Sequence, residues 1–470
     1  MDHTAAVKEI SERVADFHSR QQPFRIHHGA TNSTRPSNRS LSNTVSTEPP
    51  TRILEIDVNR CTAIVEPNVS MGALVAATKA HGLVPLVVVE FPTISVVNWI
   101  EVVLADGQVV KACNDRVETS SELADKHSDL FWGTASSFGT LGVVTLLEIQ
   151  LKKSQPLVEL KYYVTSNMKD AVRTFEEASA DPSTEYLDGI VYARDKIVIN
   201  ISDRESSPHI PDAVDYIPLT DYLFRYDRGG FWVARYAFHY FCVPFTFFTR
   251  WLLNRFMHTQ VMYHALHVSG LARRCIIQDV GVPTSTAAEF LDWLDHPENF
   301  GQYPLWLCPL LPGSAGGLEG ASTDDAKGVN RTQLLNFGIW GPAATTDQAG
   351  FVAQNRQLEH KVHNLGGKKW LHAHTYYTED EFWNIYNKLG YGSLRAKYHA
   401  QHLPSLYEKV RMRESDLPSP HRGEFESGWK GSVKRALWDV WPFCGLYGVY
   451  KAWRGGDYLL QKEILKKKTD

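Results

Sequence analysis

The chemistry-bearing residues of this sequence fall into two short stretches. The first is FRIHHGATNSTR, residues 24–35, in which we expect a short strand from Phe24 to Ile26 to run into a loop of small residues. Such a loop lets backbone N–H groups converge on one anion, while hydroxyl and amide side chains add donors. This chemistry suits a phosphate or pyrophosphate, although an ordinary polar turn has the same composition. The candidate binding residues are His28, Gly29, Thr31, Asn32, Ser33 and Thr34.

The second stretch is WLHAHTYYTEDEFW, residues 370–383. We expect a strand from Trp370 to Tyr376, whose alternation would place His372, His374 and Tyr376 on one side. Histidine and tyrosine can each donate a proton to a substrate. The same side chains also serve as packing residues with satisfied polar tips. His372, His374 and Tyr376 are therefore candidate catalytic residues.

Local patterns predict the elements that hold these stretches in place. Residues 4–18 place Val7, Ile10, Val14 and Phe17 on one face of a helix. The other elements predicted within residues 22–150 are a hairpin of RILEID and TAIVEP, a helix at 70–82, a strand from Trp99 to Leu104 with a turn at Ala105-Asp106-Gly107, and a helix that continues as a strand within 128–151.

From about residue 154 strands and helices mix, which predicts an α+β fold. The predicted strands are VELKYYV, LDGIVYA, KIVINIS, YPLWLCPLL and LLNFGIWG, and the predicted helices are MKDAVRTFEEAS, STAAEFLDWLDHP and DEFWNIYNKL. We expect Thr378 to cap the last helix, with Asp380 and Glu381 in its first turn. Residues 311–328 form a polar, Gly-rich loop, and the composition loosens into a linker and tail after about residue 412.

Composition and charge exclude several classes of protein. The net charge of −4 argues against a nucleic-acid binder. The six cysteines form no CxxC pair, so we expect neither a metal site nor a disulfide framework, and a reduced, cytosol-facing setting. No signal peptide and no spanning helix are expected. The nearest approach is the aromatic stretch 231–256, which suits either a membrane interface or a buried helix pair beside an apolar ligand.

The N-terminal run resembles the FAD-binding domain of the vanillyl-alcohol oxidase/PCMH flavoprotein superfamily. The resemblance rests on FRIHHGATNSTR, on PTIS and VLADGQVVKA, and on SDLFWGTASSFGTLGVVTLLEIQL, and it covers roughly residues 20–152. It implies that the first loop lies along the FAD pyrophosphate and that a second run packs near the cofactor. The residues assigned to that second run are Ser137, Gly139, Thr140, Gly142 and Val144. His27 and His28 do not match the usual positions of covalent flavin attachment, so noncovalent FAD is expected.

The remainder resembles the Δ24-sterol reductases, the diminuto/seladin group, and most closely their fungal branch. This resemblance rests on CIIQDVGVP, YPLWLCPLLP, HAHTYYTEDEFWNIYN and LRAKYHAQHLPSLYEKV. It implies a PCMH-type domain at residues 1–153, a substrate-binding α/β cap at 154–410, and a linker and tail at 411–470. It also implies an FAD enzyme that takes reducing equivalents from NADPH and saturates a side-chain double bond of a sterol or related terpenoid.

One segment departs from the family. The family's PTISV continues into a Gly-rich loop that clamps the FAD diphosphate, whereas here Val96 runs directly into Val97-Asn98. We therefore expect weaker FAD binding and possible mispairing of the neighbouring strands.

The sequence is also compatible with two other functions: a flavin alcohol oxidase or dehydrogenase, and a cofactor-deficient protein with a binding role. The C-terminal KKTD fits an ER-retrieval signal as well as a solvated basic end. We expect peripheral attachment to the endoplasmic reticulum membrane, facing the cytosol, with a cytoplasmic location as the alternative. The sequence carries no indication of oligomeric state.

Overall fold

The computed structural model describes most of the chain. The described residues are 2–28, 40–48, 50–86, 96–116, 127–203, 210–230, 232–310, 333–345, 347–413 and 440–455. Several predicted features lie outside them: the binding loop residues Gly29, Thr31, Asn32, Ser33 and Thr34, the segment before Val96, the Gly-rich loop at 311–328, and the C-terminal KKTD.

The N-terminal half is built on a mixed arrangement of short strands. Strand β1 (Arg25–His27) pairs in parallel with β2 (Thr44–Ser46). A six-stranded antiparallel sheet follows, and its strands in spatial order are β3 (Ile53–Asp57), β4 (Thr62–Val65), β8 (Gly142–Lys153), β6 (Val97–Leu104) and β7 (Val109–Cys113), with β5 (Leu83–Pro85) beside β8. The predicted hairpin of residues 52–67 is confirmed as the β3–β4 pair.

The helices of this half follow local sequence signals. Helix α1 (His3–Ser19) buries Val7, Ile10, Val14 and Phe17, as its periodicity predicts. Helix α2 (Met71–Lys79) starts at Ser70, whose side chain accepts a hydrogen bond from the Ala73 N–H. The short helix α3 (Ser128–Thr134) leads through Gly139 into β8, so the predicted change from helix to strand is confirmed.

Strand β6 is paired along both edges. It meets β7 from Trp99 to Val103 and β8 from Val97 to Leu104, with small register shifts against β8. Its side chains are mostly buried, and the turn at Ala105-Asp106-Gly107 closes the β6–β7 hairpin. Strand β6 itself is therefore not mispaired with β7 or β8, because its buried pattern fixes one register. The segment before Val96 lies outside the described residues.

The chain after β8 contains a large antiparallel sheet, which we call the cap sheet. Its strands in spatial order are β12 (Ala213–Pro218), β9 (Leu157–Thr165), β11 (Lys196–Asp203), β10 (Thr184–Ala193), β14 (Leu305–Leu310), β15 (Leu334–Pro342), β13 (Cys275–Pro283) and β16 (Lys368–Lys369). All of these pairs are antiparallel, so the cap is α+β and not built from parallel βαβ units as an α/β cap would be.

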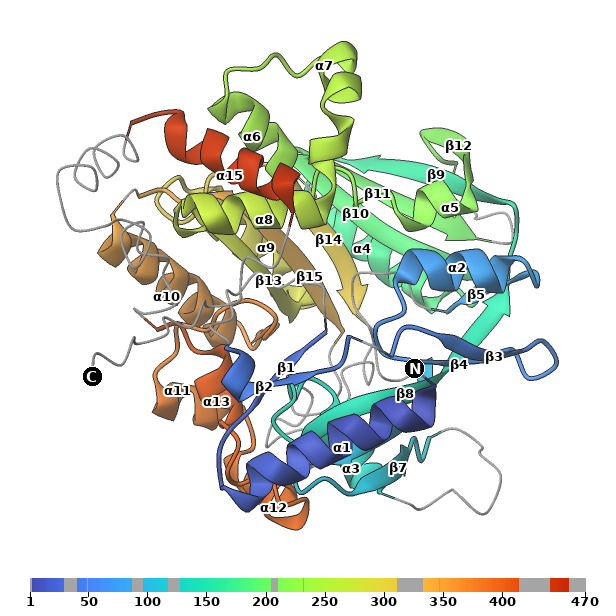
Figure 1. Cartoon of the computed structure of the whole chain (residues 1–470). Coiled ribbons are helices and arrows are strands. Elements are labelled where there is room, and N and C mark those ends of the chain that lie inside the picture. Colours follow the sequence, from blue (N-terminus) through green and yellow to red (C-terminus); the bar gives the residue numbers. More distant parts are fainter. Residues whose placement is uncertain are drawn as a thin grey trace.

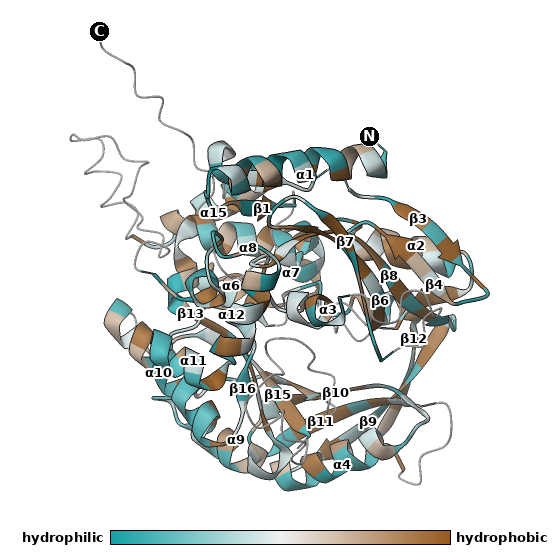
Figure 2. Cartoon of the chain, turned by 90° about the horizontal axis from the view of Figure 1, so that it is seen from below, coloured by the Kyte–Doolittle hydropathy of each residue, from teal (hydrophilic) through white to brown (hydrophobic). Residues whose placement is uncertain are grey.

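Helices cover one face of the cap sheet and leave the other turned toward the N-terminal half (Figure 2). The covering helices are α4 (Met168–Ala180), α9 (Ala287–Asp295) and α10 (Gln348–Asn364). They bury alternate strand residues, such as Ile199, Leu307 and Phe337, in one hydrophobic core. The intervening strand residues, such as Trp306 and Asp279, therefore point to the opposite face, which we call the inner face.

The chain returns to the N-terminal half after the cap sheet. Helices α11 (Glu379–Ile385), α12 (Lys388–Lys397) and α13 (Leu406–Val410) pack into the core formed by α1, α3 and β6. Thr378 caps α11, as predicted. Assigning all of residues 154–410 to a cap did not anticipate this packing, because contacts between distant segments leave no local pattern in the sequence.

A group of short helices projects from one end of the molecule (Figure 1). They are α6 (Val233–Tyr240), α7 (Phe247–Leu252), α8 (Thr259–Ser269) and, after the undescribed residues 414–439, α15 (Phe443–Arg454), whereas α5 (Leu219–Leu223) lies beside β9 and β12. None of the helices in the described part of the chain has the length and apolar character needed to cross a bilayer.

Candidate functional site

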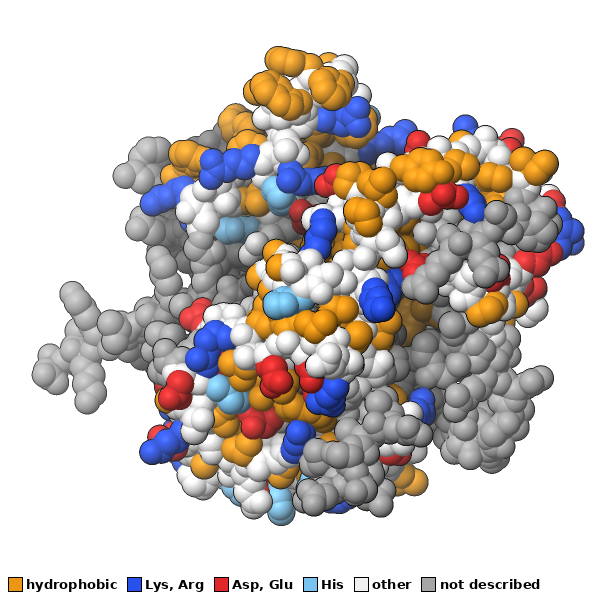
Figure 3. All heavy atoms as spheres, turned by 90° about the vertical axis from the view of Figure 1, so that its right-hand side faces the viewer, with side chains coloured by type: hydrophobic (Ala, Val, Ile, Leu, Met, Phe, Trp, Pro, Cys, Tyr) orange, Lys and Arg blue, Asp and Glu red, His pale blue; other side chains and the backbone are white. Residues whose placement is uncertain are grey.

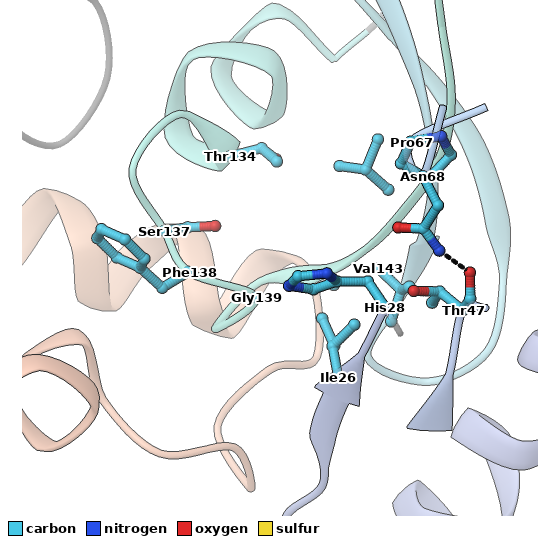
Figure 4. A pocket seen from close by; sticks show the side chains of 12 residues that line it. Ile26, His28, Thr47, Pro67, Asn68, Thr134, Ser137, Phe138, Gly139 and Val143 are labelled. Carbon is cyan, nitrogen blue, oxygen red and sulfur yellow. Dashed lines mark hydrogen bonds between the residues drawn. The ribbon is translucent and has the colours of Figure 1, made fainter. Parts of the chain in front are cut away.

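A pocket of about 320 Å³ opens where β1 meets the loop between α3 and β8 (Figure 4). Its volume is at the lower end of the range of small-molecule sites, roughly 300–1,000 Å³. The Ser137 hydroxyl and the side-chain oxygen of Asn68 point toward the space between them, and His28 lies at its base. The wall is completed by Thr134, Phe138, Gly139, Gly142, Val143 and Val144.

The glycine-bearing loop of this wall has an unusual backbone. Ser136, Phe138 and Gly139 all have positive φ angles, of 58°, 51° and 77°. A Cβ atom on Gly139 would lie 2.5 Å from Ile26 Cδ1, and one on Gly142 would lie 2.6 Å from Val103 O. Side chains at these two positions would therefore push the loop away from β1 and β6. Non-glycine residues with positive φ cluster at functional sites, where surrounding packing holds them in place.

Hydrogen bonds fix the rim of the pocket. Asn68 donates to Thr47 O, and the Thr47 N–H donates to His27 O at 2.6 Å. Within the described residues, Thr134 Oγ1 is buried and has no hydrogen-bond partner. A buried hydroxyl without a partner on a pocket wall is a ready donor or acceptor for a ligand.

The structure brings part of the predicted binding set together. His28, Ser137, Gly139, Gly142 and Val144 all line this pocket. Thr140 does not line it. Its side chain lies behind the wall, where it donates to Ser137 O and accepts a hydrogen bond from Tyr391 on α12 at 2.8 Å. The loop residues after His28 lie outside the described part of the chain.

The second predicted stretch does not form the expected strand. Strand β16 ends at Lys369, and residues 370–377 form turns and irregular backbone. The backbone of this segment, which we call the histidine loop, bonds partly to side chains and partly to the backbone of β13 and of residues 410–412. Lys369 Nζ and Gln278 Nε2 donate to His374 O, and the Tyr376 N–H donates to the Glu359 carboxylate at 2.9 Å. The prediction was wrong because these partners come from distant elements.

A buried ion pair holds the histidine loop. Lys369 Nζ lies 2.6 Å from Glu359 Oε1, and the two side chains are 0% and 1% exposed. Glu359 also accepts a hydrogen bond from Thr375, and its backbone oxygen accepts one from the Tyr377 hydroxyl. Buried charges in proteins are paired and hydrogen-bonded in this way because isolation from water is costly.

His372 forms the clearest acid–base arrangement in this region. Its Nε2 lies 3.0 Å from Asp279 Oδ2, and Asp279 is buried on the inner face of β13. Asn336 Nδ2 lies 3.4 Å from the other oxygen, and Asn336 accepts a hydrogen bond from Trp370 Nε1. The His372 side chain is 38% exposed, so the ring can reach a ligand. A carboxylate beside one ring nitrogen orients the imidazole for proton transfer.

The other two candidates have different surroundings. Tyr376 is buried in the cap core, with its ring centroid 6.2 Å from that of Phe351. Burial, reinforced by the Glu359 charge, raises the pKa of Tyr376 far above its usual value, so its hydroxyl is a weak proton donor. His374 contributes its backbone oxygen to the fixation of the histidine loop. The sequence argument treated the three residues alike, and the structure separates them.

Apolar and aromatic surface surrounds Asp279 on the inner face. Gly338 lies opposite Asp279 in the sheet, and Trp306 lies opposite Gly338. A Cβ atom on Gly338 would meet Trp306 at 3.2 Å and Asp279 Oδ1 at 3.2 Å, so glycine permits the close contact. Tyr226 lies 6.0 Å from Trp306, centroid to centroid. The predicted PLWLCP wall thus divides between the core, through Leu305 and Leu307, and the inner face, through Trp306 and Cys308.

Three residues that contact the histidine loop were not identified from the sequence. Asp279, Glu359 and Lys369 meet the histidine loop from three different elements. Asp279 stands in the CIIQDVGVP strand, where a carboxylate among buried apolar residues was the available signal. The described residues contain no cluster of three or more His, Cys, Asp and Glu side chains that could hold a metal ion.

Comparison with known proteins adds an independent observation. No protein-family model matches this sequence. The human protein named Delta(24)-sterol reductase is 25% identical over 420 residues, which cover 76% of each chain. The Arabidopsis thaliana protein of that name is 25% identical over 464 residues, covering 80% of this chain and 78% of its own.

A Caenorhabditis elegans protein named as a Delta(24)-sterol reductase homolog is 22% identical over 474 residues, covering 87% of both chains. Similarity to animal and plant proteins of this name therefore extends over most of the chain. Together with the site geometry, it supports a relationship to the Delta(24)-sterol reductases.

Proposed function

We propose that this chain reduces a C=C bond in the side chain of a sterol or related terpenoid, with noncovalent FAD as cofactor and NADPH as electron donor. The names of the relatives support the reaction class. The His372–Asp279 pair on the inner face of the cap is the single structural observation that carries the proposal. We further propose that residues 1–153 form a PCMH-type domain and that the chain belongs to the fungal branch of the family.

The pocket at β1 and β8 has features that suit part of a dinucleotide. Glycines at 139 and 142 let the loop lie close against β1 and β6, and Thr134 has a buried hydroxyl without a partner among the described residues. A volume of about 320 Å³ accommodates one portion of such a cofactor. We propose that Ser137, Gly139 and Gly142 hold FAD from this side, with His28 and the loop after it on the other. Reduced FAD, when bound, would supply a hydride to one carbon of the double bond.

The remaining chemistry belongs to the chain's own residues. An isolated alkene is a poor hydride acceptor, so a proton must reach the second carbon with the hydride or before it. We assign this proton to His372, because its ring is partly exposed and Asp279 fixes its orientation. The reaction balances as one hydride from NADPH and one proton from His372, which solvent then replaces.

The inner face also offers a surface for the hydrocarbon of the substrate. The partly exposed Tyr226 packs on the buried Trp306, beside the strand that carries Asp279. Desolvated aromatic surface with few polar groups suits a sterol, which has one hydroxyl and is otherwise apolar. We propose that this surface orients the double bond relative to His372.

The first experiment tests cofactor binding separately from chemistry. The purified full-length chain is offered excess FAD, and the visible spectrum is recorded after removal of free flavin. We expect a flavin band near roughly 450 nm, which is the absorption of the cofactor itself, and bleaching of this band by NADPH without oxygen. A chain that stays colourless with excess FAD excludes the flavin reductase and favours a cofactor-deficient binding protein. Bleaching by an alcohol and not by NADPH favours an alcohol oxidase.

The second experiment tests the assignment of His372. A Δ24-sterol is incubated with the enzyme and NADPH carrying deuterium at the transferred position, and the product is analysed by mass spectrometry. We expect one deuterium in the saturated side chain and the second hydrogen from solvent. His372→Gln should lower kcat by about 10²–10⁴-fold, the usual contribution of a general acid. The exposed His296, replaced as His296→Gln, is the matched control, and equal rates for both variants would remove His372 from the mechanism.

A further inference from the structure

Large apolar side chains are exposed at one end of the molecule. Helix α7 has no buried residue, and Phe247 and Trp251 are 79% and 66% exposed. On α15, Trp453 is 59% exposed. Every Phe or Trp that is largely exposed within the described residues belongs to these two segments: Phe245, Phe247, Phe248, Trp251, Trp441, Phe443 and Trp453. We call this set the aromatic face.

The two segments meet although about 200 residues separate them in the sequence. Trp441 Nε1 donates to Tyr240 O at 2.6 Å, and the Tyr240 hydroxyl lies 3.3 Å from Cys444 Sγ. A Cβ atom on Gly448 would lie 2.5 Å from Ala265 O, so α15 lies directly against α8. Both segments therefore extend from the same group of helices, at the top of Figure 1. Figure 3 shows α7 as a projecting knob of hydrophobic side chains with basic groups below it.

The charge around the aromatic face is mostly positive, and Asp227, beside Arg228 and His258, borders it. Residues 228–278 contain no aspartate or glutamate, and they contain the arginines Arg228, Arg235, Arg250, Arg255, Arg273 and Arg274. Residues 440–455 also lack acidic groups and contain Lys451 and Arg454. Within the described part of the chain, Arg235, Arg250, Arg255 and Arg454 form no ion pair with a carboxylate. This positive region stands out in a chain whose net charge is −4.

We propose that the aromatic face docks this protein onto the surface of a membrane that carries anionic lipid head groups. Tryptophan and phenylalanine favour the boundary between head groups and acyl chains, and arginines beside them contact lipid phosphates. The proposed attachment is interfacial and depends on the exposed aromatic side chains. A second copy of this chain is a poorer occupant, because two arginine-bearing faces without acidic groups would repel each other.

The docking face is linked to the cap sheet. The Tyr263 ring on α8 lies 6.3 Å from the Trp340 ring on β15, centroid to centroid. Strand β15 also carries Gly338, which lies beside Asp279. The docking proposal itself depends on surface chemistry alone and stands whether or not the chain reduces sterols.

Vesicle flotation with the full-length chain tests the proposal. We expect the protein to float with vesicles of phosphatidylcholine and phosphatidylserine, more weakly with phosphatidylcholine alone, and less as salt is added. The double variant Phe248→Ser/Trp251→Ser should weaken the apparent Kd about tenfold or more, because two exposed aromatics no longer enter the interface. Arg250→Gln/Arg255→Gln should reduce the preference for anionic vesicles by a similar factor.

The matched control is Leu389→Ser on α12. Leu389 is 85% exposed and lies outside the aromatic face, so this variant should bind vesicles like the unchanged chain. Equal binding by Phe248→Ser/Trp251→Ser and Leu389→Ser overturns the proposal. Absence of vesicle binding by the unchanged chain also overturns it. If the unchanged chain binds no vesicles but sediments as a dimer, and Phe248→Ser/Trp251→Ser sediments as a monomer, the aromatic face is a self-association surface and the proposal is wrong.

Discussion

The buried ion pair between Glu359 and Lys369 yields the sharpest quantitative prediction. Replacing Glu359 with glutamine removes one charge and keeps an oxygen that can accept from the Tyr376 N–H. The ammonium of Lys369 then remains in a site where its side chain has no exposed surface. Removing one partner of a buried pair costs about 3–5 kcal/mol. We expect Glu359→Gln to lower the free energy of unfolding by that amount.

Substituting Glu359 and Lys369 singly and together distinguishes the loss of their ionic attraction from a simple loss of packing. Lys369→Met alone leaves the Glu359 carboxylate buried, and it should also cost about 3–5 kcal/mol. In the double variant neither charge remains, so its destabilisation should not exceed that of either single variant by more than about 1 kcal/mol. The coupling between the two sites is then at least about 2–4 kcal/mol, at or above the upper end of the range of roughly 0.5–3 kcal/mol observed for residues of one network.

Urea unfolding followed by tryptophan fluorescence measures these differences. The control is Asp292→Asn, which breaks the ion pair with Arg194, whose side chains are 60% and 62% exposed. Exposed pairs contribute about 0–1 kcal/mol, so this variant should be nearly as stable as the unchanged chain. If Glu359→Gln is no more destabilising than Asp292→Asn, or if the two single effects simply add, the buried pair does not hold the histidine loop as we argue.

Three further predictions concern the site and the stability of the fold. Asp279→Asn should lower kcat for sterol reduction about 10²-fold or more with little change in KM, because His372 loses its orienting carboxylate; an unchanged kcat contradicts the assignment. Gly142→Ala should destabilise the chain by about 1–3 kcal/mol in thermal unfolding, since the new methyl group would meet Val103 O. Burial lowers the pKa of His402 below its usual value of 6.5, so the unfolded chain takes up a proton first and stability falls as the pH drops below 6.5. His402→Phe should reduce this loss between neutral and acidic pH, and identical pH dependence of Tm in both proteins would contradict it.

Local structure was largely predictable from the sequence. The buried face of α1, the β3–β4 hairpin, the Ser70 cap of α2 and the Thr378 cap of α11 all depend on residues within a few positions of each other. The strands of the cap sheet were likewise predicted from short apolar segments of the sequence. The resemblance to sterol reductases also rests on local motifs, and the similarity to proteins of that name agrees with it.

The histidine loop shows where local reasoning fails. Residues 370–376 alternate as a strand would, yet several of their backbone groups bond to the side chains of Glu359, Lys369 and Gln278 and not to a paired strand. The sequence of the loop itself does not predict these partners. The same limit applies to Asp279, which lies 93 residues from His372 in the chain.

The sequence by itself determined the elements, the class of fold, and the two stretches on which the candidate chemistry depends. Tertiary structure alone decided which of His372, His374 and Tyr376 faces a carboxylate and which is buried in a core. It also decided that α15 lies against α8 and joins the exposed aromatics of α7 at one end of the molecule. The physical reason is that periodicity and capping record hydrogen bonds between near neighbours, whereas burial and charge pairing depend on segments that meet only when the chain has folded.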